Sequence, residues 1–187
     1  MDLRDTYLRL RRKHPHANAS AALRSARNHL RLQERIARTG FEWEDDRHYN
    51  PTATWSEAGF DLVAKVTADE HGWWEEIGCG NGRFSDTWES GAVRHHRGGS
   101  RDCRWFIPLN ADYAHQEYER ACDYGRGWTY VRLEVVAIRT DIELSRSALH
   151  GLESDSGEDY FTETAFELAD RAIEEACEAI GRLCRSH

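Results

Sequence analysis

The spacing of apolar residues predicts two helices in the first forty residues. Apolar side chains recur at helical spacing between Leu3 and Leu10, and Pro15 ends that segment. Asn18 has the side chain of an N-cap for a second helix, which ends at Gly40. We therefore expect an N-terminal helical pair.

Alternation of apolar and polar residues predicts strands in the middle of the chain. The clearest run is Phe60–Thr67, in which every second residue is apolar, as in a half-buried strand. The other strand candidates are Phe41–Asp46, Arg83–Glu89, Arg104–Leu109, Trp128–Ile138 and Ile142–Leu149. The last two are expected to pair as a hairpin around Arg139–Asp141.

Two further helices are expected after the first strands. One covers Asp112–Tyr124 and ends at Gly125. The other begins near Ser156, has acidic residues in its first turn, and carries an apolar stripe from Phe161 to Leu183. A strand-rich middle flanked by helices predicts an α+β fold: an antiparallel sheet of about four to five strands with flanking helices, an N-terminal basic helical pair and a long C-terminal helix.

Charge divides the chain into a basic arm and an acidic body. Residues 1–40 hold ten Lys and Arg against three Asp and Glu, whereas residues 41–187 hold fifteen against thirty. The arm carries a stripe of arginines at steps of three and four residues: Arg24, Arg27, Arg31, Arg35 and Arg38. Such a stripe could follow a nucleic-acid backbone, form a solvated helix face, or dock on the acidic body of the same chain.

The acidic body suggests a surface for a basic partner. Its carboxylates concentrate between Glu153 and Glu178, because the last helix is rich in acids. The candidate partner-binding residues are Glu153, Asp155, Glu158, Asp159, Glu163 and Glu174. Three other interpretations stay open: the first four could bind a divalent cation or cap the helix, and surface acids also serve solubility. An aromatic patch around Trp73, Trp74 and Trp88 is the next candidate.

A glycine-rich segment raises an enzymatic alternative. The run from Glu76 to Phe84 resembles the first motif of class I methyltransferases, whose glycines let the backbone approach S-adenosylmethionine. That fold requires an apolar parallel strand before the glycines and a helix after them, but Trp73–Glu76 precedes them and Gly91 interrupts the segment after them. We therefore expect Gly78–Gly82 to form a loop or hairpin.

No metal, cofactor or catalytic residue is expected. Residues that could hold zinc lie within one stretch, but no local Cys or His pair at ligand spacing occurs among them: His71, Cys79, His95, His96 and Cys103. A metal-dependent enzyme remains an alternative. The five cysteines have no framework spacing, so we expect reduced thiols. Without an apolar segment long enough for a membrane or a signal peptide, we expect a cytoplasmic protein.

Several short motifs occur together between residues 83 and 180. They are Ala148–Gly157, Tyr160 and Glu167–Ala169, with an aromatic-Phe-x-Pro segment at Trp105–Pro108 and a Tyr-rich helix at Asp112–Tyr124. In these motifs, residues 83–180 resemble small uncharacterised proteins encoded by bacteriophages and prophages. The chain departs from the family at His150, where the family has Trp. The resemblance implies a setting and no mechanism.

Small acidic phage proteins often act stoichiometrically on host machinery, for example as anti-CRISPR proteins. The expected function is therefore inhibition of a host protein or ribonucleoprotein complex that has a basic surface and handles nucleic acid, in the host cytoplasm. The alternatives are a nucleic-acid-binding regulator that uses the arm, and a methyltransferase-like or metal-dependent enzyme. A homodimer is left open.

Overall fold

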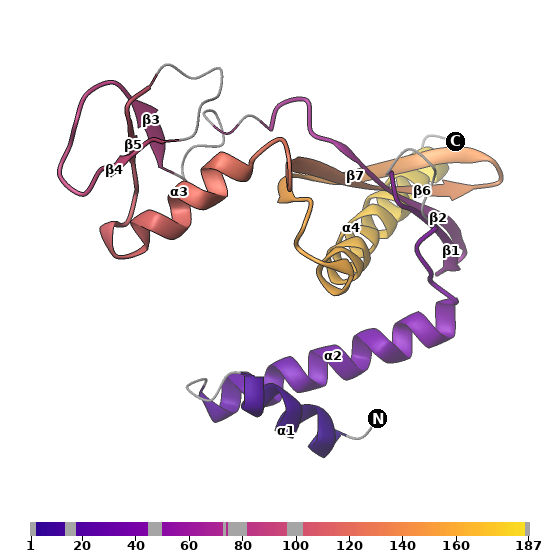
Figure 1. The fold of residues 1–187 in the computed structure, drawn as a ribbon. Coiled ribbons are helices and arrows are strands. Elements are labelled where there is room, and N and C mark those ends of the chain that lie inside the picture. Colours follow the sequence, from indigo (N-terminus) through magenta and orange to yellow (C-terminus); the bar gives the residue numbers. More distant parts are fainter. Residues whose placement is uncertain are drawn as a thin grey trace. The chain divides into compact units, whose positions relative to one another are not determined.

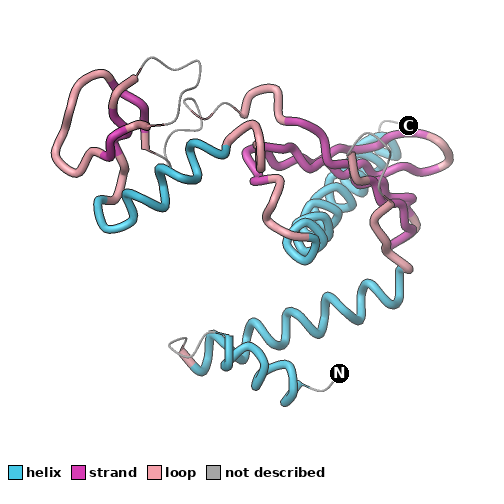
Figure 2. The backbone as a smooth tube through the Cα atoms, viewed as in Figure 1, coloured by secondary structure: helices cyan, strands magenta, loops and turns pink. Residues whose placement is uncertain are grey.

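The protein combines a larger and a smaller antiparallel sheet with four α-helices in the part that the computed structural model describes, residues 3–13, 18–44, 50–72, 74, 82–96 and 103–185. In chain order, the elements are α1 (Leu3–Lys13), α2 (Ala19–Thr39), β1 (Thr52–Glu57), β2 (Phe60–Ala68), β3 (Arg83–Ser85), β4 (Val93–Arg94), β5 (Trp105–Ile107), the 3-10 helix η1 (Ala111–Tyr113), α3 (Ala114–Asp123), β6 (Tyr130–Arg139), β7 (Ile142–Glu153) and α4 (Glu158–Arg185) (Figures 1 and 2). The strand order is β1-β2-β6-β7 in the larger sheet and β3-β5-β4 in the smaller. The α+β prediction is confirmed.

Contacts group the chain into two compact units. The first contains Met1–Ala64, Val135–Arg146 and Ala169–His187, and the second contains Lys65–Glu134 and Ser147–Leu168. The division passes through β2, β6, β7 and α4. Charge predicts a boundary after residue 40, whereas contacts place α1 and α2 in the same unit as β1.

The N-terminal helices form as their sequence predicts. They pack together through small side chains, and Thr6, Ala22 and Ala26 are buried. Asn18 caps α2 by accepting a hydrogen bond from the backbone N–H of Ser20 at 2.8 Å. Gly40 ends α2 in the left-handed conformation, at φ 66°.

Tight turns join both long pairs of strands. In the β1–β2 turn, Ala58 and Gly59 have φ of 55° and 82°; in the β6–β7 turn, Thr140 and Asp141 have φ of 50° and 61°. Two successive residues with positive φ form the turn whose twist matches that of paired antiparallel strands. The predicted β6–β7 hairpin is confirmed, whereas β1 is missing from the sequence prediction.

The alternation in β2 matches its burial. Phe60, Leu62, Ala64 and Val66 are buried, and the residues between them are exposed or half-buried. Strand β6 follows the same rule, with Leu133 and other apolar side chains buried at every second position. Period-two burial indicates that one face of each strand packs into a core.

An aromatic core stabilises the second unit. Its buried members are Trp74, Phe106, Tyr118, Ala121, Trp128 and Tyr130. The two buried indoles are satisfied, because Nε1 of Trp74 donates to the carbonyl of Gly82 at 3.1 Å and Nε1 of Trp128 donates to that of Arg120 at 3.0 Å. Buried tryptophans need such partners for their N–H groups.

The short strands differ most from the prediction. Residues 41–43 form no strand, and Glu44 makes only an isolated bridge with Thr52, so the Phe41–Asp46 prediction is wrong for its described part. Strands β3 and β5 are shorter than predicted, and β4 was not predicted. All three small strands depend on pairing with each other, for example Phe84 and Val93 both opposite Phe106.

We predict opposite effects of alanine at two glycines. A Cβ at Gly82 would lie 2.3 Å from the carbonyl oxygen of Ile107 and 2.6 Å from the Phe106 ring, so Gly82→Ala should lower the free energy of unfolding by about 1–3 kcal/mol. Gly181 lies in α4, where an added Cβ would meet only the guanidinium of Arg185 at an ordinary contact distance of 3.8 Å, so Gly181→Ala should raise the free energy of unfolding by about 0.5–1 kcal/mol. Urea unfolding measures both, and a neutral Gly82→Ala would contradict the packing around β5.

Candidate partner-binding surface

Helix α4 carries a row of exposed carboxylates, here called the α4 carboxylate stripe. Its members follow one another at steps of four, four, three, four and four residues: Asp159, Glu163, Glu167, Asp170, Glu174 and Glu178. With 3.6 residues per turn, these steps place one carboxylate on each turn of the same face, over about 28 Å of helix.

The opposite face of α4 is apolar and buried. Ala165, Ala169, Ala172 and Ala176 have no exposed surface, and Leu168 is 2% exposed. Within the first unit, the hydroxyl of Ser145 in β7 donates to the carbonyl of Ala172. Because the alanine face is packed, the carboxylate face must point to solvent.

Much of the negative charge on the stripe is not neutralised. Asp170 pairs with Arg35, and Glu178 lies 3.9 Å from Arg182 one turn along α4. Among the described residues, no cation pairs with Glu163, Glu167 or Glu174. The stripe can therefore attract cationic groups of another molecule.

The structure separates the six acidic residues that the sequence predicts as a binding surface. Asp159, Glu163 and Glu174 lie on the stripe, whereas Glu158 lies on another face of the first turn of α4. The other stripe members, Glu167, Asp170 and Glu178, are not among the six predicted residues, although their spacing is visible in the sequence.

Glu153 and Asp155 have partners inside the second unit. Arg120 of α3 pairs with Glu153 at 2.8 Å and with Asp155 at 2.5 Å, and its guanidinium lies 3.9 Å from the centre of the Trp128 ring. The hydrogen bond from Arg120 lowers the pKa of Asp155 although burial opposes this. These two acids thus hold α3 against the segment before α4.

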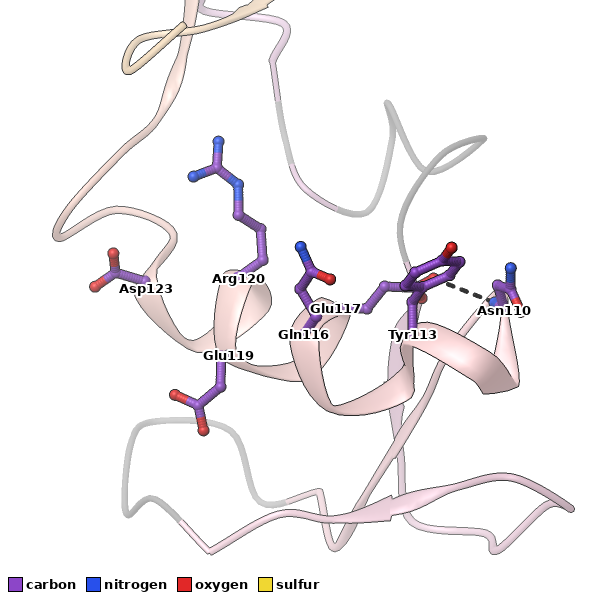
Figure 3. A pocket seen from close by; sticks show the side chains of 7 residues that line it. All are labelled: Asn110, Tyr113, Gln116, Glu117, Glu119, Arg120 and Asp123. Atoms are coloured by element: carbon purple, nitrogen blue, oxygen red, sulfur yellow. Dashed lines mark hydrogen bonds between the residues drawn. The ribbon is translucent and has the colours of Figure 1, made fainter. Parts of the chain in front are cut away.

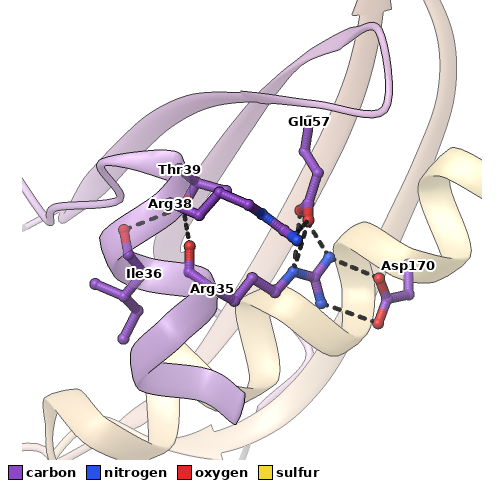
Figure 4. A network of polar contacts seen from close by, with 6 residues as sticks. All are labelled: Arg35, Ile36, Arg38, Thr39, Glu57 and Asp170. Carbon is purple, nitrogen blue, oxygen red and sulfur yellow. Dashed lines mark hydrogen bonds and ion pairs between the residues drawn. The ribbon is translucent and has the colours of Figure 1, made fainter. Parts of the chain in front are cut away.

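The arginine stripe of α2 is also divided. Arg24, Arg27 and Arg31 are exposed. Arg35 and Arg38 form ion pairs with Glu57 of β1, at 2.8 and 2.6 Å, and Arg35 also reaches Asp170 of α4 at 2.6 Å (Figure 4). Part of the arm therefore docks on acidic residues of its own chain.

Glu57 is the half-buried centre of this network. Its side chain is 13% exposed and accepts from Nε and Nη2 of Arg35 and from Nη2 of Arg38. Burial acts to raise the pKa of Glu57, but the hydrogen bonds and charge of Arg35, with Arg38, outweigh burial and lower it. Glu57 therefore stays ionised and holds α2.

A more deeply buried carboxylate, that of Asp69, lies beyond the end of β2. The Asp69 side chain is 2% exposed and accepts from the backbone N–H of Gly151 at 2.8 Å and of His71 at 3.1 Å, while Nδ1 of His150 lies 3.3 Å away. Gly151 lies within β7 at a positive φ of 70°, a conformation that glycine adopts without strain. His150 and Asp69 thus fix the end of β7.

The structure gives packing roles to several other residues singled out in the sequence. Gly82 is enclosed by Phe106, Ile107 and Pro108, so packing explains its missing side chain, and the antiparallel sheet is not the parallel one that a class I methyltransferase requires. Residues 75–81, with the other motif glycines, lie outside the described residues. Trp74 is buried and Trp73 is not described, so only Trp88 of the aromatic patch is known to be exposed, at 61%.

The candidate zinc ligands do not converge in the described part of the chain. His95 Nδ1 lies 3.2 Å from the Tyr118 hydroxyl, which also accepts from the backbone of His96 at 3.1 Å. Cys79 is not described, and no group of three potential ligands occurs among the described residues. Four cysteines are described as free: Cys103, Cys122, Cys177 and Cys184.

A shallow cavity of about 820 Å³ runs along α3. Seven side chains line it: Asn110, Tyr113, Gln116, Glu117, Glu119, Arg120 and Asp123 (Figure 3). Glu117 accepts from the backbone N–H groups of Leu109 and Asn110, and Arg120 is committed to Glu153 and Asp155. Two of the four charged side chains that line this cavity, Glu117 and Arg120, are thus bound to other parts of the protein.

None of the described helices is both long and apolar enough to span a membrane. A scan of protein-family models gives no match to this chain, and searches of curated proteins and of solved structures give none either.

We predict that the Glu57 network makes the free energy of unfolding depend on pH. The pKa of Glu57 is lower in the folded state than in the unfolded state. Its contribution to the free energy of unfolding is therefore complete above the unfolded pKa of about 4.3 and is lost as pH falls through the folded pKa. The difference in free energy of unfolding between wild type and Glu57→Gln should therefore shrink below about pH 4.3. Urea unfolding between pH 7 and pH 3 measures this difference, and a difference that does not change with pH would contradict the network.

Proposed function

We propose that this chain is a stoichiometric binding protein that docks its α4 carboxylate stripe on a basic surface of a host protein or ribonucleoprotein that handles nucleic acid. The observation that carries the proposal is the regular, outward-facing row of carboxylates, of which Glu163, Glu167 and Glu174 have no cationic partner among the described residues. Such a row attracts a basic patch and accelerates encounter with it.

The stripe presents several carboxylates in line to a basic surface. They recur about every 5.4 Å along α4, a wider interval than the roughly 3.4 Å between phosphates along the axis of one DNA strand, so the charges need not match one to one. Basic channels that follow a phosphate backbone can thus meet several carboxylates of α4 in succession. Binding there would exclude the nucleic acid.

The resemblance to bacteriophage proteins supplies the setting for this proposal. A phage protein gains from blocking nucleases or CRISPR complexes, whose channels hold nucleic acid through basic surfaces. We therefore propose counter-defence in the host cytoplasm, by occlusion and without catalysis.

One observation favours a second candidate function. Arg24, Arg27 and Arg31 are exposed on α2 and could contact phosphates, as in a nucleic-acid-binding regulator. Arg35 and Arg38 are already held by Glu57, so the row available to nucleic acid is shorter than the sequence suggests.

We predict that charge reversal on the stripe abolishes partner binding without unfolding the protein. Glu163→Lys with Glu174→Lys changes two exposed side chains, and exposed changes cost little stability. Glu158 and Asp159 are left unchanged, because their charge favours the first turn of α4. Capture from bacterial lysate, followed by surface plasmon resonance on the captured protein at several salt concentrations, measures the effect. The wild type should associate more slowly as salt rises, whereas the reversed variant should not bind.

The matched control is Glu42→Lys with Asp86→Lys. Both residues are exposed and lie outside α4, and the pair changes net charge by the same amount. Equal loss of binding by control and stripe variants would show that net charge alone acts. Retention of binding by the stripe variant would sink the proposal, and loss of duplex DNA binding on Arg31→Glu would favour the second function.

A further inference from the structure

The contact between Arg35 and Asp170 joins the two charged rows of this protein within its first unit. Nη1 of Arg35 donates to Oδ2 of Asp170 at 3.1 Å, and Nη2 donates to Oδ1 at 2.6 Å (Figure 4). Two parallel N–H···O bonds form the arrangement by which arginine recognises a carboxylate most strongly. The stripe therefore already holds one guanidinium group, which is supplied by the chain itself.

The two rows also share their spacing. Arginines follow one another along α2 at steps of three, four, four and three residues, and carboxylates follow one another along α4 at steps of three or four. Each helix thus presents about one charge per turn on one face. A helix with arginines at this spacing can place several of them on the carboxylates of α4.

We propose that α2 is an intramolecular competitor for the α4 carboxylate stripe: Arg35 occupies Asp170 until an arginine-bearing helix of the partner takes its place. The inference rests on the proposed function. It adds the chemistry of the partner, a helix with arginines spaced three and four residues apart. It also adds an internal contact that lowers the affinity of the stripe for any ligand that must displace Arg35.

The two ends of the Arg35 contact differ in exposure. The Asp170 side chain is 65% exposed, whereas the Glu57 side chain is 13% exposed and is also bound by Arg38. Exchange therefore takes place at Asp170, while Glu57 keeps Arg35 and α2 in position. An exposed ion pair of this kind weakens a competing ligand by about 1.5- to 5-fold.

The test uses a fluorescent alanine-based peptide of about twenty residues with arginines on one helical face. Fluorescence anisotropy at low salt compares Arg35→Gln with Arg38→Gln. Both remove one positive charge from α2, but among the described residues Arg38 pairs with Glu57 and not with Asp170. We expect Arg35→Gln to bind the peptide about 1.5- to 5-fold more tightly than Arg38→Gln.

Further variants keep the test decisive. Asp170→Asn added to Arg35→Gln should remove the gain, because the released carboxylate is then absent. Arg35→Lys keeps the charge but not the paired bonds, so it should give a smaller gain even if Arg35→Gln is poorly folded by circular dichroism. A peptide with the same arginines distributed around the helix should bind more weakly.

The outcomes separate this inference from the proposed function. Equal affinities of Arg35→Gln and Arg38→Gln, with clear binding by the wild type, would overturn the competitor and leave the stripe as a binding surface. Absence of peptide binding by every variant would overturn both. A gain that survives Asp170→Asn would also contradict the competitor.

Discussion

The packing of the alanine face of α4 is the constraint on which the rest of the surface depends. Ala165, Ala169, Ala172 and Ala176 are fully buried, and a helix with such small side chains approaches its neighbours closely. Rotation of α4 about its own axis by the angle between two successive residues would bring acidic side chains into the buried face. Burial of an unpaired charge there would cost much free energy. The same packing that stabilises the helix thus fixes the carboxylates in one outward row.

The Arg35 network shows how the charge of this protein serves its structure before any partner is present. Glu57 is half-buried, and Arg35 and Arg38 lower its pKa although burial acts to raise it. Removing one partner of such a pair costs more than the pair contributes, because the remaining charge is left without compensation. Part of the basic arm is therefore committed to the fold, and the sequence alone could not show which part.

Local patterns predicted those elements whose signals lie close together in the chain. The cap at Asn18, the alternation in β2 and the apolar stripe of α4 all depend on residues a few positions apart. The first two are confirmed, and the stripe is buried as far as Ala176, whereas its predicted last member, Leu183, is 63% exposed. Strand β1 was missed because only Ala53 and Trp55 mark its buried face. The partners of Arg35 could not be predicted either, since they lie 22 and 135 residues away. The full carboxylate stripe could have been predicted, because its spacing is regular in the sequence.

The arrangement of the acids argues for a partner more strongly than their number does. Solubility requires surface charge but no particular order, and alternating signs would satisfy it. In α4, neighbouring acids such as Glu163 and Glu167 lie four residues apart, where like charges destabilise a helix by about 0.2–0.5 kcal/mol per pair. Only Asp170, among the stripe residues, gains a partner from another helix of the described chain. The stripe therefore destabilises the helix that carries it, and one of its members is already bound by an arginine. Both features are expected of a surface that binds further arginines.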